Sequence, residues 1–361
     1  MPDKIITRKS EVRPKRTCIG LINRLSLSSV IFNNKLGVIL VTGGTGFLGS
    51  TVLKHLIDGG ESIVAIKRAT SIIPDHLKSS SLIQWVDADI TDYFALEDIF
   101  PTIKQVYHCA AKISNHQEDA QEMFQTNIEG TKHIVNLSLL YQVRLVHVSS
   151  IAALGTNKLG LPVKETDKWE YNRKTSNYTL AKYDSEMEVW RGIVEGLDAV
   201  IVNPSIIMGV GPGENGSRSI FEVVKKGNKI YPLGSVGIVD VDDVAQIMIK
   251  LMNSHISGER FILNSENISN QALLTKISDY MQKPRPSIAA NRMLLSMAWR
   301  LSKLASYING KRPTLTKDAA RAANKKLEYD NSKITKTLGV TFKPVDTTLK
   351  EVVETYYSKT I

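Results

Sequence analysis

The chain has 361 residues, 42% hydrophobic and 23% charged, which is ordinary for a globular protein and enough for a sizeable core. Two cysteines exclude a disulfide framework and a cysteine-rich metal site, and they favour a reducing compartment. The net charge of +10 lies in the flanks, because residues 1–37 and 283–336 are basic whereas residues 38–282 are mildly acidic. Solvated flanks explain this pattern more simply than nucleic acid, so no nucleic-acid partner is expected. No run of about 18 apolar residues occurs, so no integral membrane span is predicted.

Residues 1–37 form a basic leader with no clear secondary-structure pattern. Its Arg, Lys and Ser content resembles a transit peptide, although Asp3 and Glu11 fit poorly; a leader from an upstream start site is an equal alternative. We expect this segment to be disordered. The expected location of the remainder is the cytoplasm.

From residue 38, short apolar runs alternate with helical patterns, which predicts βαβ units and a parallel sheet. The expected strands are 37–43, 62–68, 82–90, 105–111, 144–150 and 198–205, and the expected helices are 50–60, 92–100, 117–141 and 177–195. Right-handed crossovers then give a doubly wound sheet. The predicted fold is α/β, with a Rossmann-type dinucleotide-binding core over 38–205.

After residue 205 the pattern becomes irregular, so a smaller, mostly helical substrate-binding region is predicted over 206–361, interleaved with the last core strands (238–265). A helix expected over 286–308 has a broad apolar face made by Leu294, Leu295, Ala298, Leu301, Leu304, Ala305 and Ile308. This face either caps the substrate cleft or makes weak contact with a membrane surface. The cap is the preferred interpretation, because such faces usually belong to the core.

The stretch VTGGTGFLG (41–49) joins the first strand to the first helix and spaces three glycines three residues apart. Gly43 can make the tight turn, Gly46 lets the backbone approach a pyrophosphate, and Gly49 lets the helix pack on the strand. The helix N-terminus then faces the anion. This context predicts a dinucleotide cofactor; the alternative is a turn that is glycine-rich for structural reasons alone.

The end of the second strand bears on the choice of cofactor. Lys67 and Arg68 stand where an NAD site usually carries an acidic residue. A cation suits a 2′-phosphate, so NADP is favoured, with Arg68 as the preferred contact and NAD as the alternative. A separate explanation is that both side chains are simply solvated at the end of the strand.

The third and fourth strands end in residues that suit a cofactor edge. Small side chains at Ala110 and Ala111 would let a cofactor lie against the sheet. Asp89, followed by Ile90, either accepts a hydrogen bond from an adenine amino group or caps the helix that follows.

Tyr178 and Lys182 lie four residues apart, so a helix would place them on one face. The same spacing recurs in YINGK (307–311) and YDNSK (329–333). Only the first pair starts a long helical pattern, 28 residues after a strand-end serine, Ser150. A tyrosine with a pKa of about 10 needs roughly 4 kcal/mol of anion stabilisation to exchange protons near neutrality, and a neighbouring ammonium can contribute it.

From residue 38 to the C-terminus, the chain resembles the extended short-chain dehydrogenases/reductases of the NAD-dependent epimerase/dehydratase group. The resemblance is carried by seven motifs, which occur in the order TGGTGFLG, DADITD, HCAA, TNIEGT, HVSS, YTLAK and VDVDDVA. The resemblance is closest to dihydroflavonol-4-reductase-like and 3β-hydroxysteroid-dehydrogenase-like enzymes. It implies Ser150, Tyr178 and Lys182 as catalytic residues, with Asn127 supporting the lysine through water. It also implies a set of cofactor contacts: Gly43, Thr45, Gly46, Phe47, Leu48, Gly49, Arg68, Asp89, Ile90, Ala110, Ala111, Tyr178, Lys182 and Pro204. A homodimer is a family expectation, and Asn203 departs from the arginine that the family often carries before this proline.

Three functions are compatible with these residues. The first is an NAD(P)-dependent oxidoreductase that reduces a ketone, or oxidises a secondary alcohol, of a small apolar or cyclic molecule. The alternative is a nucleotide-sugar epimerase or dehydratase, for which Arg218, Lys225 and Lys226 are the candidate diphosphate contacts. A non-catalytic dinucleotide sensor or assembly subunit is the second alternative. No metal site is predicted, because no ligand spacing links the histidines, and Asp240 and its neighbours are better explained as a helix cap.

Overall fold

The computed structural model describes residues 37–212 and 217–358, so most of the basic leader lies outside the described residues. Within them, seven parallel strands form the central sheet in the order β10-β6-β5-β4-β1-β2-β3. The strands are β1 (Val38–Thr42), β2 (Ile63–Lys67), β3 (Ile83–Asp87), β4 (Ile103–His108), β5 (Arg144–Val148), β6 (Ala199–Pro204) and β10 (Glu259–Leu263). Chain order reverses between β1 and β4, and a ligand of an open α/β sheet binds at such a switch point. The predicted Rossmann-type sheet is confirmed.

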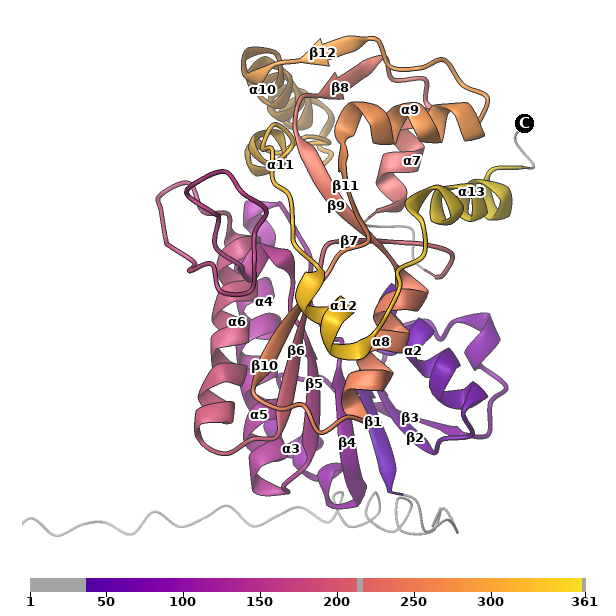
Figure 1. Ribbon diagram of the computed structural model, residues 1–361, viewed down its shortest axis with the longest axis vertical. Coiled ribbons are helices and arrows are strands. Elements are labelled where there is room, and N and C mark those ends of the chain that lie inside the picture. Colours follow the sequence, from indigo (N-terminus) through magenta and orange to yellow (C-terminus); the bar gives the residue numbers. More distant parts are fainter. Residues whose placement is uncertain (1–36, 213–216, 359–361) are drawn as a thin grey trace, which may run out of the picture. The chain divides into compact units, whose positions relative to one another are not determined.

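Helices cover both faces of this sheet (Figure 1). Helices α2 (Phe47–Asp58) and α8 (Val241–Met252) pack on one face, and α3 (Tyr93–Glu97), α5 (Gly130–Leu140) and α6 (Asn177–Val194) pack on the other. The central strands are apolar on both sides; Leu40 faces one core and Val41 the other, and both are fully buried. This is why the strands appear in the sequence as continuous apolar runs.

The predicted helix over 117–141 is broken into four pieces: η3 (Gln117–Asp119), α4 (Ala120–Phe124), a π-helical turn η4 (Gln125–Glu129) and α5. Helix α2 begins at Phe47, three residues before the predicted start, because Gly46 takes the extended conformation of an N-cap. Three further single turns, η1 (Asp75–Leu77), η2 (Phe100–Thr102) and η5 (Ile151–Ala153), lie in the connections.

The C-terminal elements build two small sheets and a third core. One sheet contains β7 (Ile206–Met208), β9 (Ser235–Asp240) and β11 (Glu266–Ser269), and the other contains β8 (Ile230–Pro232) and β12 (Ile288–Ala290). Their helices are α7 (Arg218–Lys225), α9 (Asn270–Tyr280), α10 (Arg292–Asn309), α11 (Lys317–Ala322), α12 (Ser332–Leu338) and α13 (Val345–Tyr356). The predicted aspartate cap is present: the Asp240 side chain accepts from Asp242 N, and α8 therefore begins at Val241.

The prediction for 286–308 is wrong in two respects. Residues 288–290 form strand β12, and α10 starts only at Arg292, because the Asn291 side chain caps it by accepting from Leu294 N at 2.9 Å. Of the seven predicted apolar positions, Leu295 alone is buried, whereas Leu301, Leu304 and Ile308 are exposed. None of the described helices is long and apolar enough to cross a membrane.

Candidate active site

The glycine-rich turn between β1 and α2 has a backbone that side chains would obstruct. Gly43 has a φ of +69°, and a Cβ there would stand 2.7 Å from the backbone nitrogen of Ala110. A Cβ on Gly49 would stand 2.2 Å from the Gly43 carbonyl oxygen, which accepts a hydrogen bond from Gly46 N at 2.9 Å. Gly46 caps α2 without any side-chain hydrogen bond. The helix therefore presents its first N–H groups without a competing cap, as a pyrophosphate site requires.

The other predicted residues of this turn differ in their surroundings. Thr45 is half-buried, and Leu48 packs into the core beneath the helix. The Phe47 ring lies against Gly211, where a Cβ would stand 2.7 Å from the ring. Phe47 and Gly211 also line a small pocket with Gly209, Ser217, Arg218, Phe221 and Val352. The turn thus meets the C-terminal elements at Phe47.

The two cations after β2 have different partners. Lys67 is mostly buried and forms an ion pair with Asp87 on the neighbouring strand. Arg68 is exposed, and its nearest carboxylate is an oxygen of Glu122 at 3.9 Å. An exposed pair at that distance is weak, so Arg68 is the cation that an incoming phosphate can recruit.

The residues that follow β3 decide one of the two explanations offered for Asp89. Asp92, not Asp89, caps α3, with its side chain accepting from Ala95 N at 3.1 Å, so the capping explanation of Asp89 is wrong. Asp89 is exposed and accepts from Thr91 N at 2.9 Å and from the Thr91 hydroxyl at 2.8 Å. The cap falls three residues later because Asp92 is the residue that precedes the helical turn.

The other three predicted cofactor contacts at the strand ends also have defined positions. Ile90 is buried against Gly130 of α5. Ala111 is exposed beyond the end of β4. Pro204 is buried at the end of β6.

A chain of hydrogen bonds fixes the loop after β4. Ala110 N donates to the Thr42 hydroxyl at 3.1 Å, and the same hydroxyl lies 2.7 Å from His108 Nδ1. The Thr131 hydroxyl donates to the Asn127 carbonyl at 2.6 Å and therefore accepts from His108 Nε2 at 3.0 Å. With its Nε2 as the donor, a neutral His108 accepts at Nδ1 from the Thr42 hydroxyl. Burial, the larger cause, and the Lys182 ammonium lower the pKa of His108 to about 3.

Asn127 is buried in the π-helical turn and clamps the same loop. Its Oδ1 accepts from Lys112 N at 2.7 Å, and its Nδ2 donates to the Lys112 carbonyl at 3.0 Å. The π-turn shifts the hydrogen-bond register by one residue, so backbone groups on α4–α5 are freed for other partners. The predicted asparagine therefore joins the loop after β4 to the helix that packs beside α6.

Ser150, Tyr178 and Lys182 meet at the carboxyl ends of β5 and β6. The Ser150 side chain accepts from Ala152 N at 3.1 Å. Burial raises the pKa of Tyr178, and a hydrogen bond with Ser150 partly offsets that rise. Lys182 is buried and donates from Nζ to the Val148 carbonyl at 2.9 Å. Burial lowers the pKa of Lys182 to about 8, against the opposing effect of the Glu186 carboxylate.

Glu186 is a residue of this site that the sequence analysis missed. It is fully buried one turn beyond Lys182, and four donors surround its carboxylate. The donors are Ser149 Oγ at 2.5 Å, Asn203 Nδ2 at 2.7 Å, Arg260 Nη1 at 2.8 Å and Trp190 Nε1 at 3.1 Å. Its i, i+4 spacing from Lys182 was the available signal, but the same spacing is typical of solvated helix faces.

The two other tyrosine–lysine patterns lie elsewhere. Tyr307 is 74% exposed near the end of α10, which stops at Gly310 in a left-handed conformation. Lys333 donates to the Arg260 carbonyl at 2.8 Å and lies 4.7 Å from the ring centroid of Phe261 on β10. The structure thus brings Tyr178 and Lys182, of the three pairs, next to Ser150. Among the described residues no group of His, Cys, Asp or Glu could hold a metal ion.

Comparison with known proteins decides the family. The family model described as the NAD dependent epimerase/dehydratase family matches residues 39–263. The chain belongs to this family. It is therefore an NAD(P)-dependent enzyme of the extended short-chain dehydrogenase/reductase type, as the motifs predicted.

Relatives of this family enzyme include a protein named as a putative reductase and one named as a sterol demethylase protein. A putative dihydroflavonol 4-reductase of Synechocystis sp. (strain ATCC 27184 / PCC 6803 / Kazusa) is 30% identical over 309 residues, covering 83% of this chain and 89% of the relative. Sterol demethylase protein B of Methylococcus capsulatus is 29% identical over 256 residues, covering 69% and 76%.

Solved structures share the fold. The protein gox2253 matches with a TM-score of 0.75 at 27% identity, covering 88% of this chain and 97% of that one. UDP-glucose 4-epimerase from Thermotoga maritima, solved with UDP-glucose, matches with a TM-score of 0.72 at 23% identity, covering 90% and 99%. Reductases and epimerases thus share this architecture, and the site itself must distinguish between them.

Proposed function

We propose that this enzyme reduces a ketone of a small apolar or cyclic molecule with NADPH, with Tyr178 as the acid. The observation that carries the proposal is the convergence of Ser150, Tyr178 and Lys182 at the sheet edge that also holds the glycine-rich turn. The C-terminal edge is where open parallel sheets bind ligands.

The residues present suit a phosphorylated dinucleotide. Gly43, Gly46 and Gly49 leave room for backbone contact with a pyrophosphate at the N-terminus of α2. Arg68 has a free face for a 2′-phosphate, whereas Lys67 is neutralised by Asp87. Ala110, Ala111 and Pro204 would flank the cofactor. When bound, the cofactor supplies the hydride, and the protein must supply the proton.

The protonation state of Tyr178 supports its role as the proton donor. Burial raises the pKa of its hydroxyl, so Tyr178 is protonated at neutral pH and can act as a donor. Ser150, which hydrogen-bonds that hydroxyl, is in position to orient a substrate carbonyl and to stabilise the developing alkoxide. We expect Lys182, buried one helical turn further along the same face, to stabilise the tyrosinate that remains.

Two of the three candidate contacts for a nucleotide-sugar diphosphate, Arg218 and Lys225, are engaged otherwise, which favours the reductase; Lys226 is exposed. Arg218 donates to the Gly211 carbonyl at 2.9 Å and stacks on the Tyr356 ring at 4.0 Å. The Lys225 ammonium lies 5.4 Å from the centroid of the Tyr357 ring. Recruiting either cation to a diphosphate would break these contacts.

The test is substrate turnover in a matched pair of variants. A screen of carbonyl compounds should identify one whose reduction consumes NADPH, and no UDP- or GDP-sugar should turn over. Tyr178→Phe should then lower kcat by at least about a thousandfold, since it removes the proton donor, while the Kd for NADPH changes less than about threefold. Tyr307→Phe, from a pair that lies outside the site, should match the wild type. Full activity of Tyr178→Phe on the identified substrate would refute the mechanism.

A further inference from the structure

Helix α10 carries an apolar stripe that the rest of the described chain leaves uncovered. Its members are Met293, Met297, Leu301, Leu304 and Ile308, here called the outer stripe, with exposed fractions of 72%, 51%, 62%, 57% and 80%. Spacings of four, four, three and four residues place them on one face of the helix. The opposite face holds the buried Leu295, which packs with Ala290 and Ala320. Scattered apolar residues on a surface are normal, but a contiguous stripe of five indicates a contact surface.

The charge around the outer stripe has one sign. Residues 280–317 contain eight Lys/Arg and no Asp or Glu. Arg300 and Lys303 are exposed on α10 itself, with their cations 4.8 Å from the Trp299 ring and 5.9 Å from the Tyr307 ring. A cationic rim beside an apolar stripe is the pattern of helices that lie in the interface of an anionic membrane.

The positive charge around α10 also indicates which partner covers the outer stripe. A second copy of this chain would bring the same basic segment against itself, and like charges would oppose the apolar contact. A membrane surface with anionic headgroups can bury the apolar stripe and pair with the basic residues beside it at the same time. We propose that α10 docks this enzyme peripherally on an anionic lipid bilayer, with the outer stripe in the interface and Arg300 and Lys303 at the headgroups.

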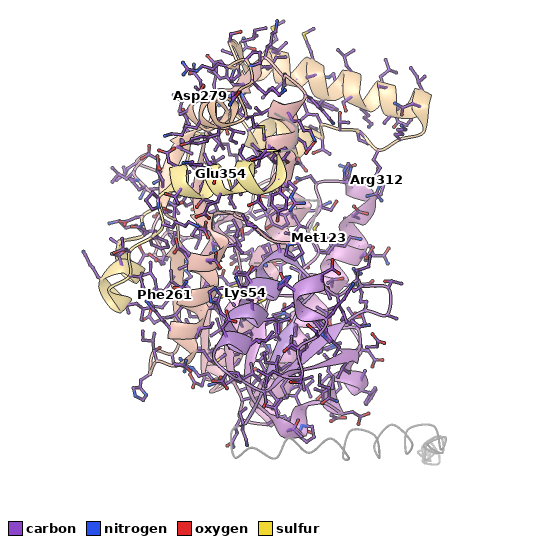
Figure 2. The ribbon with its side chains drawn as sticks, turned by 90° about the vertical axis from the view of Figure 1, so that its right-hand side faces the viewer. Lys54, Met123, Phe261, Asp279, Arg312 and Glu354 are labelled. Carbon is purple, nitrogen blue, oxygen red and sulfur yellow. The ribbon has the colours of Figure 1, made fainter. Side chains whose placement is uncertain are left out.

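The docking helix is fixed to the body of the enzyme. Beyond α10, Arg312 forms two hydrogen bonds with the Asp119 carboxylate, at 2.9 and 3.2 Å. Asp119 also accepts from the Ser114 hydroxyl at 2.6 Å, in the loop that leads from Lys112 to α4. Figure 2 shows Arg312 between α10 and the purple part of the ribbon. Membrane contact would therefore hold the enzyme with the loop after β4 close to the lipid.

Vesicle co-sedimentation of the full chain tests the docking surface. The probes are vesicles of 70% phosphatidylcholine and 30% phosphatidylserine, and vesicles of phosphatidylcholine alone. The wild type should pellet with the first at least about tenfold more strongly than with the second, and added salt should weaken binding. The double variant Leu301→Gln/Leu304→Gln and the charge reversal Arg300→Glu/Lys303→Glu should each lower binding at least about tenfold.

Matched controls change exposed residues outside α10. Ile72→Gln/Leu159→Gln removes two exposed apolar side chains, and Lys54→Glu/Lys104→Glu reverses two exposed charges. Both should bind as the wild type does. Absence of binding to the anionic vesicles, or an equal loss in the controls, would overturn the proposal. A dimer in sedimentation velocity that Leu301→Gln/Leu304→Gln converts to a monomer would overturn it too, because the stripe would then be a contact between copies.

Discussion

Replacing Glu186 by glutamine should destabilise the enzyme and move its pH profile. The carboxylate is fully buried and accepts from Ser149 and Asn203 on one oxygen and from Trp190 and Arg260 on the other. Whichever way the new amide turns, its NH2 group faces two donors. The Ser149 hydroxyl can rotate to accept, but Trp190 and Arg260 cannot. The Asn203 amide could accept only by flipping, which would turn its Oδ1 toward the Ser150 carbonyl, so at least one unfavourable contact remains.

The loss of stability can be estimated from the ion pair that Arg260 loses when the Glu186 carboxylate is replaced. Removing one member of a buried ion pair costs about 3–5 kcal/mol, and the lower end applies here because Arg260 keeps its bonds to the Glu165 carbonyl and is 17% exposed. About 3 kcal/mol corresponds to a fall in Tm of roughly 4 °C in a domain of this size.

The substitution should also shift the pH dependence of catalysis in a predictable direction. The Glu186 carboxylate raises the pKa of Lys182 against burial, which holds it at about 8. Without that charge the pKa of Lys182 falls further, so the lysine loses its proton at a lower pH. The alkaline limb of the kcat/KM profile should therefore move to lower pH.

Differential scanning fluorimetry and steady-state reduction across pH measure the two effects. Glu188→Gln is the control, since Glu188 lies on the same helix but pairs with Arg191 at a partly exposed site; its Tm should change by less than about 2 °C. If Glu186→Gln keeps the wild-type Tm and its alkaline limb stays in place, the carboxylate neither holds the site together nor supports the lysine.

Two further predictions concern the cofactor and acid stability. Arg68→Ala should raise the Kd for NADPH about tenfold or more and leave that for NADH unchanged, whereas Lys67→Ala should keep their ratio; fluorescence titration decides, and an unchanged NADPH affinity in Arg68→Ala would contradict the NADP assignment. Burial, followed by electrostatic interactions with His108 and Lys182, holds the pKa of His147 well below its usual value. Its stabilising contribution is therefore complete above about pH 6.5 and falls by about 1.4 kcal/mol per pH unit below it. His147→Leu should therefore lose less Tm between pH 7 and pH 5 than the wild type, and His76→Gln, at an exposed site, should lose as much; equal losses in all three would refute this assignment.

The sequence predicted the sheet because its central strands are mostly apolar on both faces, and such strands appear as short continuous apolar runs. It also predicted the glycine-rich turn, because a positive φ at Gly43 and the contact of Gly49 with the Gly43 carbonyl are local requirements. The π-turn at 125–129 escaped prediction, since it contains no Gly or Pro that would break a helix. The face of α10 was misjudged for another reason: helical spacing shows that an apolar face exists, but not whether anything covers it.

The donors around Glu186 show a further limit, because Ser149 and Arg260 are separated from it by 37 and 74 residues. Asn203 gives this arrangement a physical reason. It replaces the arginine that the family often carries, and its neutral amide donates to both Glu186 and the Ser150 carbonyl, at 2.7 and 3.0 Å. An amide leaves the charge of Glu186 unbalanced, and Arg260 on the adjacent strand β10 supplies the balancing cation. The departure from the family pattern thus acts behind Ser150 and Lys182, through the Ser150 carbonyl and the Glu186 carboxylate that the Asn203 amide joins.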